Sequence, residues 1–322
     1  MLINLIKLSK NPNLGESMQI WKLLSIVFLV GLVATLGYVA TILTAQQPAQ
    51  QTTTITKTLP PTTITVTQPP SQQQTISIAG STTVAPIAEE IARIFMERYP
   101  GIKVSVAGIG SGPGIKSVGA GEVDIGMASR DIKPAEFEKY PDLKPFIIAK
   151  DSVAIIVHPS NPVEDLSIEQ VAMIYAGKIT NWKEVGGPDK EIVVVTREAG
   201  SGTRAIFEKF VMKPNKVEIG GMAVVKPSNG EVRATIATTE NAIGYISLGY
   251  VDETVKAVSL DGVKPTIENV VAGKYPITRN LYLITKGEPS LVEQAFIGLA
   301  LSPEGQEIIS KLGYIPILKP TP

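Results

Sequence analysis

Cysteine is absent from the 322 residues of the sequence, and histidine occurs once, as His158. The lack of cysteine excludes a disulfide framework, and it excludes the lipidated cysteine by which many exported proteins are anchored. One imidazole and no thiol leave too few groups for a catalytic triad together with a metal centre. We therefore expect His158 to be structural, and we expect no catalytic residues, no metal and no cofactor.

An excess of charge of one sign is also missing, because 30 basic residues balance 30 acidic ones. No stretch interleaves basic and aromatic residues as nucleic-acid-binding surfaces do, so nucleic acid is not an expected partner. Hydrophobic residues make up 44% of the chain and charged residues 19%, which is typical of a folded protein with one or two cores.

One long run without any charge stands out at residues 23–45. As a helix it would be roughly 34 Å long, enough to span a bilayer. Lys22 precedes it, and Trp21 stands at its start as an interfacial aromatic would. We expect residues 1–22 in the cytoplasm, a single transmembrane anchor, and the rest of the chain outside the cell. A cleaved signal peptide, which would make the protein secreted, is the alternative, although its apolar core is normally about 7 to 15 residues.

The next 29 residues, 46–74, hold nine Thr, eight Gln and five Pro, with Lys57 as the only charge. This composition buries too little apolar surface to offset the entropy of the chain, and its prolines favour extended conformations. We expect a disordered extracellular linker.

From residue 75 onward, apolar strand-like runs alternate with helical patterns. The first strand is expected at 75–79 and the first helix at 86–101, with Ile87, Ile91, Ile94 and Phe95 on one face. Further strands are predicted at 102–110, 123–129, 146–159, 191–196, 222–227, 242–248 and 280–285. This alternation indicates an α/β fold with a mainly parallel sheet, in which ligands bind at the carboxyl ends of the strands. The length of this part suggests two lobes.

Four loops at strand ends share hydroxyl groups, glycine and arginine. Each alone could be an ordinary helix cap or a solvated turn. Together they supply what a dehydrated oxyanion needs: helix N-termini with unpaired N–H groups, hydroxyl donors, and guanidinium forks. The candidate residues are Ser81, Thr82 and Thr83 in the first loop, Ser111 in the second, Ser129, Arg130 and Asp131 in the third, and Arg197, Ser201, Gly202 and Thr203 in the fourth.

Motifs of nucleotide-binding and hydrolytic enzymes are not matched. The glycines of 108–114 stand at alternate positions, unlike a dinucleotide fingerprint. Lys116 does not directly follow a glycine, as the lysine of a phosphate-binding P-loop does. The chain also has no serine in a nucleophile-elbow pattern within these loops.

Several segments together resemble the phosphate-binding subunit of phosphate-specific ABC transporters. The most specific are AGSTTVAPIAEEIA (79–92), GIGSGPGIKSVGAGEVDIGMASRDI (108–132) and VVVTREAGSGTRAIFEKFV (193–211). The resemblance implies a type II periplasmic-binding-protein fold, with two α/β lobes joined by two hinge strands. We place lobe I at 75–155 and 276–322, lobe II at 156–275, and the hinge strands at 151–159 and 276–285.

The same resemblance implies that the chain captures inorganic phosphate, as a monomer, and delivers it to an ABC permease with its ATPase. The family's phosphate contacts fall on Thr82 and Thr83 with Ser81 beside them, on Ser111, and on Arg197, Ser201, Gly202 and Thr203. In the third loop the family's better-known branch has an aspartate directly after Ala-Ser, where this chain reads Ser129-Arg130-Asp131. Either Ser129 stands at the position of the family's aspartate, or Asp131 reaches into the site from one position further along the chain.

Three other functions remain open at this point. A binding protein for sulfate, tungstate or phosphonate would use the same helix N-termini. An extracellular phosphatase would need a nucleophile with a base, or two metals. A structural or adhesive surface protein would account for the anchor and the linker, but not for four loops with the same chemistry.

Overall fold

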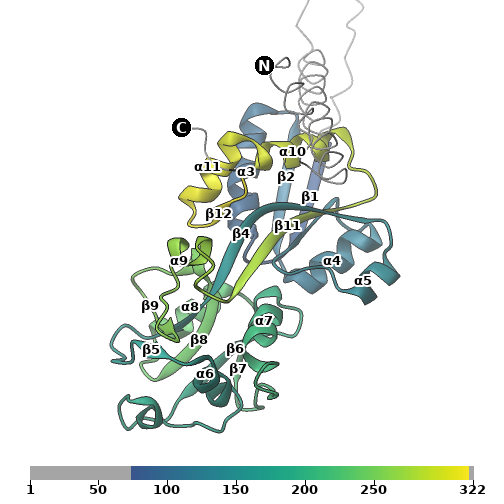
Figure 1. Ribbon diagram of the computed structural model, residues 1–322. Coiled ribbons are helices and arrows are strands. Elements are labelled where there is room, and N and C mark those ends of the chain that lie inside the picture. Colours follow the sequence, from purple (N-terminus) through teal and green to yellow (C-terminus); the bar gives the residue numbers. More distant parts are fainter. Residues whose placement is uncertain (1–73, 319–322) are drawn as a thin grey trace, which may run out of the picture. The chain divides into compact units, whose positions relative to one another are not determined.

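The computed structural model describes residues 74–318 (Figure 1). The predicted transmembrane segment at 23–45, and the predicted linker at 46–74 apart from Gln74, lie outside these residues. Between residues 74 and 318, no helix has the length and hydropathy that crossing a bilayer requires.

The first group of elements, which we call lobe I, comes from both ends of the described chain. Its N-terminal part alternates strands and helices as predicted from the sequence, and its C-terminal part adds two helices and a short strand. The elements are β1 (Gln74–Gly80), α3 (Ala85–Arg98), β2 (Ile102–Gly108), α4 (Ser111–Ala120), β3 (Ile125–Ala128), α5 (Pro134–Lys139), α10 (Leu291–Leu301), α11 (Pro303–Lys311) and β12 (Ile315–Pro316).

The second group, lobe II, is one continuous stretch of chain. Its elements are β5 (Asp165–Leu166), α6 (Ile168–Tyr175), β6 (Val193–Arg197), α7 (Gly202–Phe207), β7 (Val224–Lys226), α8 (Asn229–Ala237), β8 (Ala242–Ser247), β9 (Lys256–Ala257), β10 (Ser259–Leu260) and α9 (Ile267–Val271). Short 3-10 turns at Trp182–Val185 and Leu248–Tyr250, and a π-helical turn at Glu208–Met212, complete it. The helix that begins at Gly202 is thus an α-helix that continues as a π-turn.

Two long strands, β4 (Leu143–Val157) and β11 (Thr278–Lys286), connect the lobes, and we call them the crossover strands. They lie side by side in Figure 1 and pair antiparallel from Leu143 opposite Lys286 to Ser152 opposite Thr278. From Val153 onward β4 pairs instead with β8 of lobe II. One continuous strand therefore changes partners between Ser152 and Val153.

The sheet order is β2-β1-β3-β11-β4-β8-β6-β7. The prediction of a mainly parallel sheet was wrong for its centre. Pairs within each lobe, such as β1 with β2 and β6 with β8, are parallel, because each strand returns through a helix. The pairs of β11 with β3, of β11 with β4 and of β4 with β8 are antiparallel, because the crossover strands run in opposite directions between the lobes.

The core of lobe I follows the predicted helical pattern. Ile87, Ile91 and Phe95 of α3 are fully buried. Pro86 stands in the first turn of α3, where its missing N–H is not needed, and the helix ends at Arg98, shortly before Pro100 and Gly101. Phe95 meets Phe296 of α10 edge to face, with 5.5 Å between ring centroids. The C-terminal segment thus covers the first helix and fixes the position of the loops around it.

The core of lobe II is built on aromatic rings. Phe207 of α7 stacks on Tyr245 of β8 with 4.1 Å between ring centroids, and Tyr175 of α6 lies 4.5 Å from Phe207. All three side chains are buried. Because Phe207 belongs to the helix that starts at Gly202, this stack holds the start of α7 against β8.

Candidate oxyanion site

Three helices start at loops that the sequence singled out. The turn Ser81–Val84 leads into α3, α4 begins at Ser111, and α7 begins at Gly202 directly after its cap, Ser201. The first N–H groups of a helix have no intrahelical acceptor and carry a partial positive charge. A fourth helix, α8, also begins here, at Asn229, and the sequence analysis did not single it out.

Five hydroxyl groups from both lobes are buried at these helix starts. They belong to Thr82, Thr83, Ser111, Ser129 and Thr203, whose exposures are 8%, 0%, 0%, 1% and 1%. We call these five residues the hydroxyl cluster. Thr83 Oγ1 of lobe I lies 3.3 Å from Thr203 Oγ1 of lobe II, and Ser111 Oγ lies 3.3 Å from Ser129 Oγ. The predicted loops therefore meet at one place.

Gly202 brings lobe II into direct contact with the two serines of lobe I. A Cβ atom added at Gly202 would stand 2.3 Å from Ser111 Oγ and 2.4 Å from Ser129 Oγ. A second contact joins the same two loops, because the amide of Gly112, next to Ser111, donates to the carbonyl of Gly200 at 2.9 Å. A side chain at this start of α7 would therefore have to displace the hydroxyls of Ser111 and Ser129.

The hydroxyls of Ser81 and Ser201 serve their own loops. Ser81 Oγ accepts from the amide of Thr83 at 3.1 Å, and Ser201 Oγ accepts from the amide of Arg204 at 3.2 Å. Both side chains are buried. These two predicted site residues therefore shape the loops that carry Thr82, Thr83, Gly202 and Thr203.

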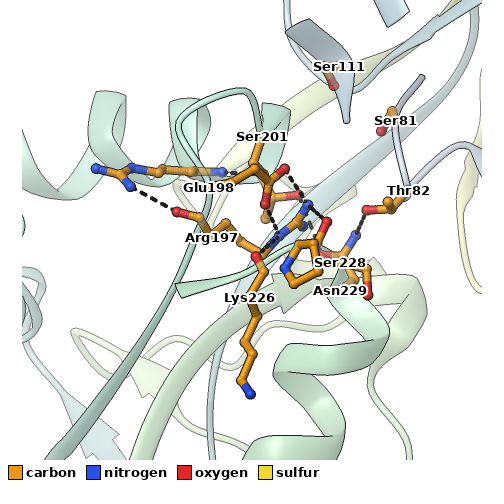
Figure 2. A network of polar contacts seen from close by, with 12 residues as sticks. Ser81, Thr82, Ser111, Arg197, Glu198, Ser201, Lys226, Ser228 and Asn229 are labelled. Carbon is orange, nitrogen blue, oxygen red and sulfur yellow. Dashed lines mark hydrogen bonds and ion pairs between the residues drawn. The ribbon is translucent and has the colours of Figure 1, made fainter. Parts of the chain in front are cut away.

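Arg197 lies beside the cluster with its guanidinium largely engaged. Nε and Nη2 each donate to the Glu198 carboxylate at 3.0 Å, and they also donate to the carbonyls of Lys226 and Pro227 at 3.1 and 2.9 Å. Figure 2 shows Glu198 and Lys226 around Arg197, with Ser201 nearby. The side chain is 1% exposed, and Nη1 has no hydrogen-bond partner. One buried donor of this predicted residue is thus left for a guest.

Arg130 and Asp131 are not part of the hydroxyl cluster. Arg130 is buried, but it pairs with Glu136 at 2.6 Å and donates to the carbonyl of Asp131 at 2.9 Å. Burial by itself would raise the pKa of Glu136, but the hydrogen bonds from Arg130 and from the Lys133 amide lower it overall. The Arg130 ion pair is therefore kept near neutral pH.

Asp131 is exposed, and its Oδ1 accepts from the hydroxyl of Tyr282 at 2.6 Å. Burial, strengthened by this hydrogen bond, raises the pKa of Tyr282 to about 12. Tyr282 thus stays protonated near neutral pH, and its hydroxyl keeps the Asp131 carboxylate away from the hydroxyl cluster. Of the two alternatives for the third loop, it is Ser129 that lies among the hydroxyls.

A buried ion pair on the crossover strands completes the site, and the sequence analysis missed it. Asp151 of β4 faces Arg279 of β11, and both side chains are 1% exposed. Arg279 Nη1 donates to Ser129 Oγ at 3.3 Å and to Thr203 Oγ1 at 2.9 Å, and Nη2 donates to Thr83 Oγ1 at 3.2 Å. One guanidinium therefore contacts hydroxyls of both lobes. The signal was a charged residue within each otherwise largely apolar strand pattern.

Asn229 at the start of α8 was also missed, although it links the lobes. Its Nδ2 donates to Thr82 Oγ1 at 3.2 Å and to Thr83 Oγ1 at 2.9 Å, while its Oδ1 accepts from the Ser247 amide at 3.2 Å. Figure 2 shows Asn229 reaching toward Thr82, with Ser228 next to it. No sequence motif marks this residue, because its partners in lobe I, Thr82 and Thr83, are 147 and 146 positions away in the chain.

Comparisons with known proteins show to which family the chain belongs. Residues 65–304 match the family model of the PBP superfamily domain. The phosphate-binding protein PstS of Bacillus subtilis is 36% identical over 244 residues, covering 75% of this chain and 80% of that protein. The chain belongs to the PstS family. A second PstS, from Borreliella burgdorferi, is 32% identical and covers 76% of this chain and 91% of its own.

A solved structure also assigns the chain to the PstS family. A substrate-binding protein of Clostridium perfringens, attributed to a phosphate ABC transporter and solved with bound phosphate, is 42% identical with a TM-score of 0.72. The match covers 76% of this chain and 100% of that one. The two-lobed type II periplasmic-binding-protein fold, which the sequence resemblance implied, is thereby confirmed for this PstS-family chain.

Proposed function

We propose that this protein is an extracytoplasmic substrate-binding protein that captures inorganic phosphate between its lobes and delivers it to an ABC transporter permease and its ATPase. It is a binding protein and not an enzyme. The observation that carries the proposal is the meeting of Thr83, Ser111 and Ser129 of lobe I with Gly202 and Thr203 of lobe II. The proposal is supported by relatives that are named for phosphate binding and that match 75% and 76% of the chain.

The chemistry of these groups suits a dehydrated tetrahedral anion. Helix N-termini supply N–H donors and a partial positive charge, and hydroxyl groups supply O–H donors. The free Nη1 of Arg197 supplies a charge-assisted donor. Burial makes each of these interactions stronger than it would be in water. Because the donors come from both lobes, the bound anion would hold the lobes together, and loss of the anion would let them separate about the crossover strands.

Calorimetric titration of the full-length chain in detergent, freed of bound anion, tests the proposal with phosphate and sulfate. We expect tight binding of phosphate. The variant Thr203→Val keeps the shape of a fully buried side chain and removes its hydroxyl, so phosphate affinity should fall about 10- to 100-fold, the effect of one hydrogen bond to a charged partner. Thr254→Val, on an exposed turn of lobe II, is the control and should bind as the wild type does. Absence of phosphate binding by the wild type would refute the proposal.

The uncharged run at 23–45 supports a second part of the proposal, that the protein is anchored by a single transmembrane helix with the binding lobes outside the cell. Residues 46–74 would then be the linker, and the protein would work as a monomer. Extraction of cell membranes with alkaline carbonate should leave the protein in the membrane fraction. Recovery in the soluble fraction, with an N-terminus beyond residue 45, would show cleavage instead.

A further inference from the structure

Two tyrosine hydroxyl groups donate to neighbouring backbone carbonyls in the turn before α3. The Tyr250 hydroxyl donates to the carbonyl of Thr82 at 2.7 Å, and the Tyr314 hydroxyl donates to the carbonyl of Thr83 at 2.8 Å. Tyr314 directly precedes β12 and belongs to lobe I. Tyr250 belongs to the 3-10 turn Leu248–Tyr250 of lobe II. Two bonds of the same chemistry therefore differ in one respect: the Tyr250 bond joins the lobes, and the Tyr314 bond lies within lobe I.

The carbonyl of Thr82 depends on a donor from outside its helix. In a helical turn the carbonyl of one residue accepts from the N–H four residues later, as the carbonyl of Ser81 does from Ala85 at 3.0 Å. Four residues after Thr82 stands Pro86, which has no N–H. A carbonyl that is buried without a donor is unfavourable. With the lobes together, Thr82 is 8% exposed, and the Tyr250 hydroxyl replaces the water that would otherwise hydrate its carbonyl.

Tyr250 is held in position by its own lobe. Its ring packs against the buried residues around β8 and α8, and Arg233 of α8 lies over the ring at 5.9 Å from the centroid. The same arginine donates to the Tyr250 carbonyl at 3.2 Å. Burial, with the charge of Glu89 adding, raises the pKa of Tyr250 to about 12, so its hydroxyl remains a donor near neutral pH. Lobe II therefore presents this hydroxyl to lobe I without any change in its own fold.

The residue before Tyr250 brings the same turn against lobe I. A Cβ atom added at Gly249 would stand 2.8 Å from Cζ and 2.9 Å from Cε1 of Tyr314. The turn thus packs on the ring whose hydroxyl holds the Thr83 carbonyl. The lobes therefore meet here through a close packing contact and a hydrogen bond, and neither Gly249 nor Tyr250 belongs to the hydroxyl cluster.

We propose that Tyr250 is a closure latch: its bond to the Thr82 carbonyl forms when the lobes come together around the bound oxyanion, and it slows their separation. Tyr250 is a positioning residue, because it acts through the Thr82 loop and its hydroxyl proton is used by the carbonyl. It sets how long an anion stays bound and does not choose between anions. Tyr314 keeps its bond whether the lobes are together or apart. The inference rests on the proposed phosphate binding and adds a residue that controls its lifetime.

The first test compares phosphate kinetics in the wild type and in Tyr250→Phe, using the full-length chain in detergent. Dissociation is followed by chasing radiolabelled phosphate with an excess of unlabelled phosphate, and calorimetry gives the dissociation constants of phosphate and arsenate. We expect dissociation to become about 3- to 10-fold faster, the effect of one hydrogen bond between neutral groups. The association rate should stay the same, because the bond forms after the anion is captured. Phosphate and arsenate affinities should fall by the same factor.

Tyr314→Phe is the matched variant that separates a latch from a purely structural bond. Without anion the lobes are apart and the Tyr250 hydroxyl is in water, so Tyr250→Phe should unfold at the same urea concentration as the wild type. Tyr314→Phe should unfold at a lower concentration, because its bond lies within lobe I. With saturating phosphate both variants should unfold earlier than the wild type. If Tyr250→Phe lowers the urea midpoint equally with and without phosphate, the bond does not depend on closure and the proposal is overturned.

Gly249→Ala tests the same contact without changing a hydroxyl group. Its methyl group would meet the ring of Tyr314 when the lobes are together and would be free when they are apart. Phosphate should again dissociate faster and associate at an unchanged rate. Gly221→Ala, where a Cβ meets no atom within 4 Å, is the control and should keep both rates of the wild type.

The outcomes distinguish the latch from phosphate binding itself. A dissociation rate in Tyr250→Phe equal to that of the wild type would overturn the latch and leave phosphate binding intact. So would a change in the ratio of phosphate to arsenate affinity, because it would place Tyr250 in contact with the anion. Failure of the wild type to bind phosphate would instead refute the proposed function, and the latch with it.

Discussion

The two lobes hold their parts of the site by different means. In lobe I the loops are fixed by backbone contacts: the amide of Ser81 donates to the carbonyl of Met127 at 2.9 Å. Gly80 approaches the same residue so closely that a Cβ would stand 2.2 Å from the Met127 oxygen, and its φ of +146° also requires glycine. The position of the lobe I hydroxyls is therefore set by the course of the chain.

In lobe II the corresponding positions depend on side chains. Tyr245 donates or accepts at Thr196 Oγ1, at 2.7 Å, and accepts from the Arg197 amide at 3.2 Å. Arg197 in turn is held by Glu198 and by two carbonyls, and Asn229 connects to both lobes. The comparison teaches that changes at the polar side chains of lobe II should have graded effects. Changes at closely packed glycines, Gly80 in lobe I and Gly202 where lobe II meets lobe I, should have large ones.

The largest expected effect is that of Gly202→Ala, which tests the contact between the lobes directly. The helical conformation of Gly202 suits alanine, so α7 should remain stable, but the new Cβ would overlap Ser111 Oγ and Ser129 Oγ. Overpacking of this kind costs roughly 1 to 3 kcal/mol, so phosphate affinity should fall about 10- to 100-fold by calorimetry.

Gly221→Ala is the matched control for this prediction, because a Cβ at Gly221 meets no atom within 4 Å. It should bind phosphate as the wild type does. Unchanged affinity in Gly202→Ala would mean that the lobes do not approach each other at this residue when phosphate is bound.

A smaller effect is expected for Asn229→Ala, which removes the one side chain of lobe II that donates to both Thr82 and Thr83. The fully buried amide also holds the Ser247 amide, which would lose its partner. We expect phosphate affinity to fall about tenfold, since a net hydrogen bond of this kind contributes about 1 to 1.5 kcal/mol.

The control for Asn229 is Asn280→Ala on β11. Asn280 contacts the hydroxyl of Tyr282 and none of the five residues of the hydroxyl cluster. Equal losses of phosphate affinity in the two variants would show that Asn229 acts through general stability and not by joining the lobes.

Tyr245→Phe should have a modest effect that is confined to lobe II. It preserves the ring stacked on Phe207 and removes the hydroxyl that holds Thr196 and the Arg197 amide. We expect a loss of about 1 kcal/mol in the free energy of unfolding, measured in urea, and a phosphate affinity reduced a few-fold.

Tyr275→Phe provides the comparison, because its buried hydroxyl donates only to the Val153 carbonyl, at 3.1 Å. It should lose similar stability and no phosphate affinity. A loss of affinity as large as that of Tyr245→Phe would argue against a specific role of Tyr245 in placing Arg197.

The smallest effect in ordinary buffers is that of pH on the lobe II core. Burial raises the pKa of Tyr245 to about 12, above its value of about 10 in the unfolded chain. The folded state therefore binds more protons than the unfolded state between these values, and stability falls as pH rises from 10 to 12. Below pH 10 both states are protonated, and this group contributes no pH dependence.

We expect this difference in the pKa of Tyr245 to lower the free energy of unfolding by about 1 kcal/mol between pH 9 and pH 11. Urea unfolding of wild type and Tyr245→Phe at pH 9, 10 and 11 measures this contribution. The difference between the two proteins should shrink with rising pH. A difference that stays constant would show that Tyr245 ionises equally readily in both states.

The sequence predicts much of lobe I and less of the centre of the molecule. The loops around Thr83 and Ser111 are readable because each follows an apolar strand and starts a helix, and the Ser129 loop because it ends an apolar strand; these signals are local. Arg197 was found for the same reason. The alternation of strands and helices also predicts the parallel pairs at either end of the sheet, but not the antiparallel pairs of the crossover strands.

Arg279 and Asp151 illustrate what local patterns leave out. Each is a charged residue within a largely apolar strand, and only the pairing of β4 with β11 brings them together across 128 residues. Asn229 likewise acts on residues of the other lobe. Asp131 was considered because related proteins have an aspartate at nearly this position, but the hydroxyl of Tyr282, 151 positions away, holds it elsewhere.

The partner change within β4 has a consequence for how the protein is made. Lobe II is encoded without interruption, whereas β3 and the first part of β4 await β11, which is synthesised more than 120 residues later. A chain emerging from a ribosome or a translocation pore can therefore complete lobe II first and must keep the unfinished edge of lobe I from associating with other chains meanwhile. Truncation before Thr278 should thus be far more damaging than its position near the C-terminus suggests.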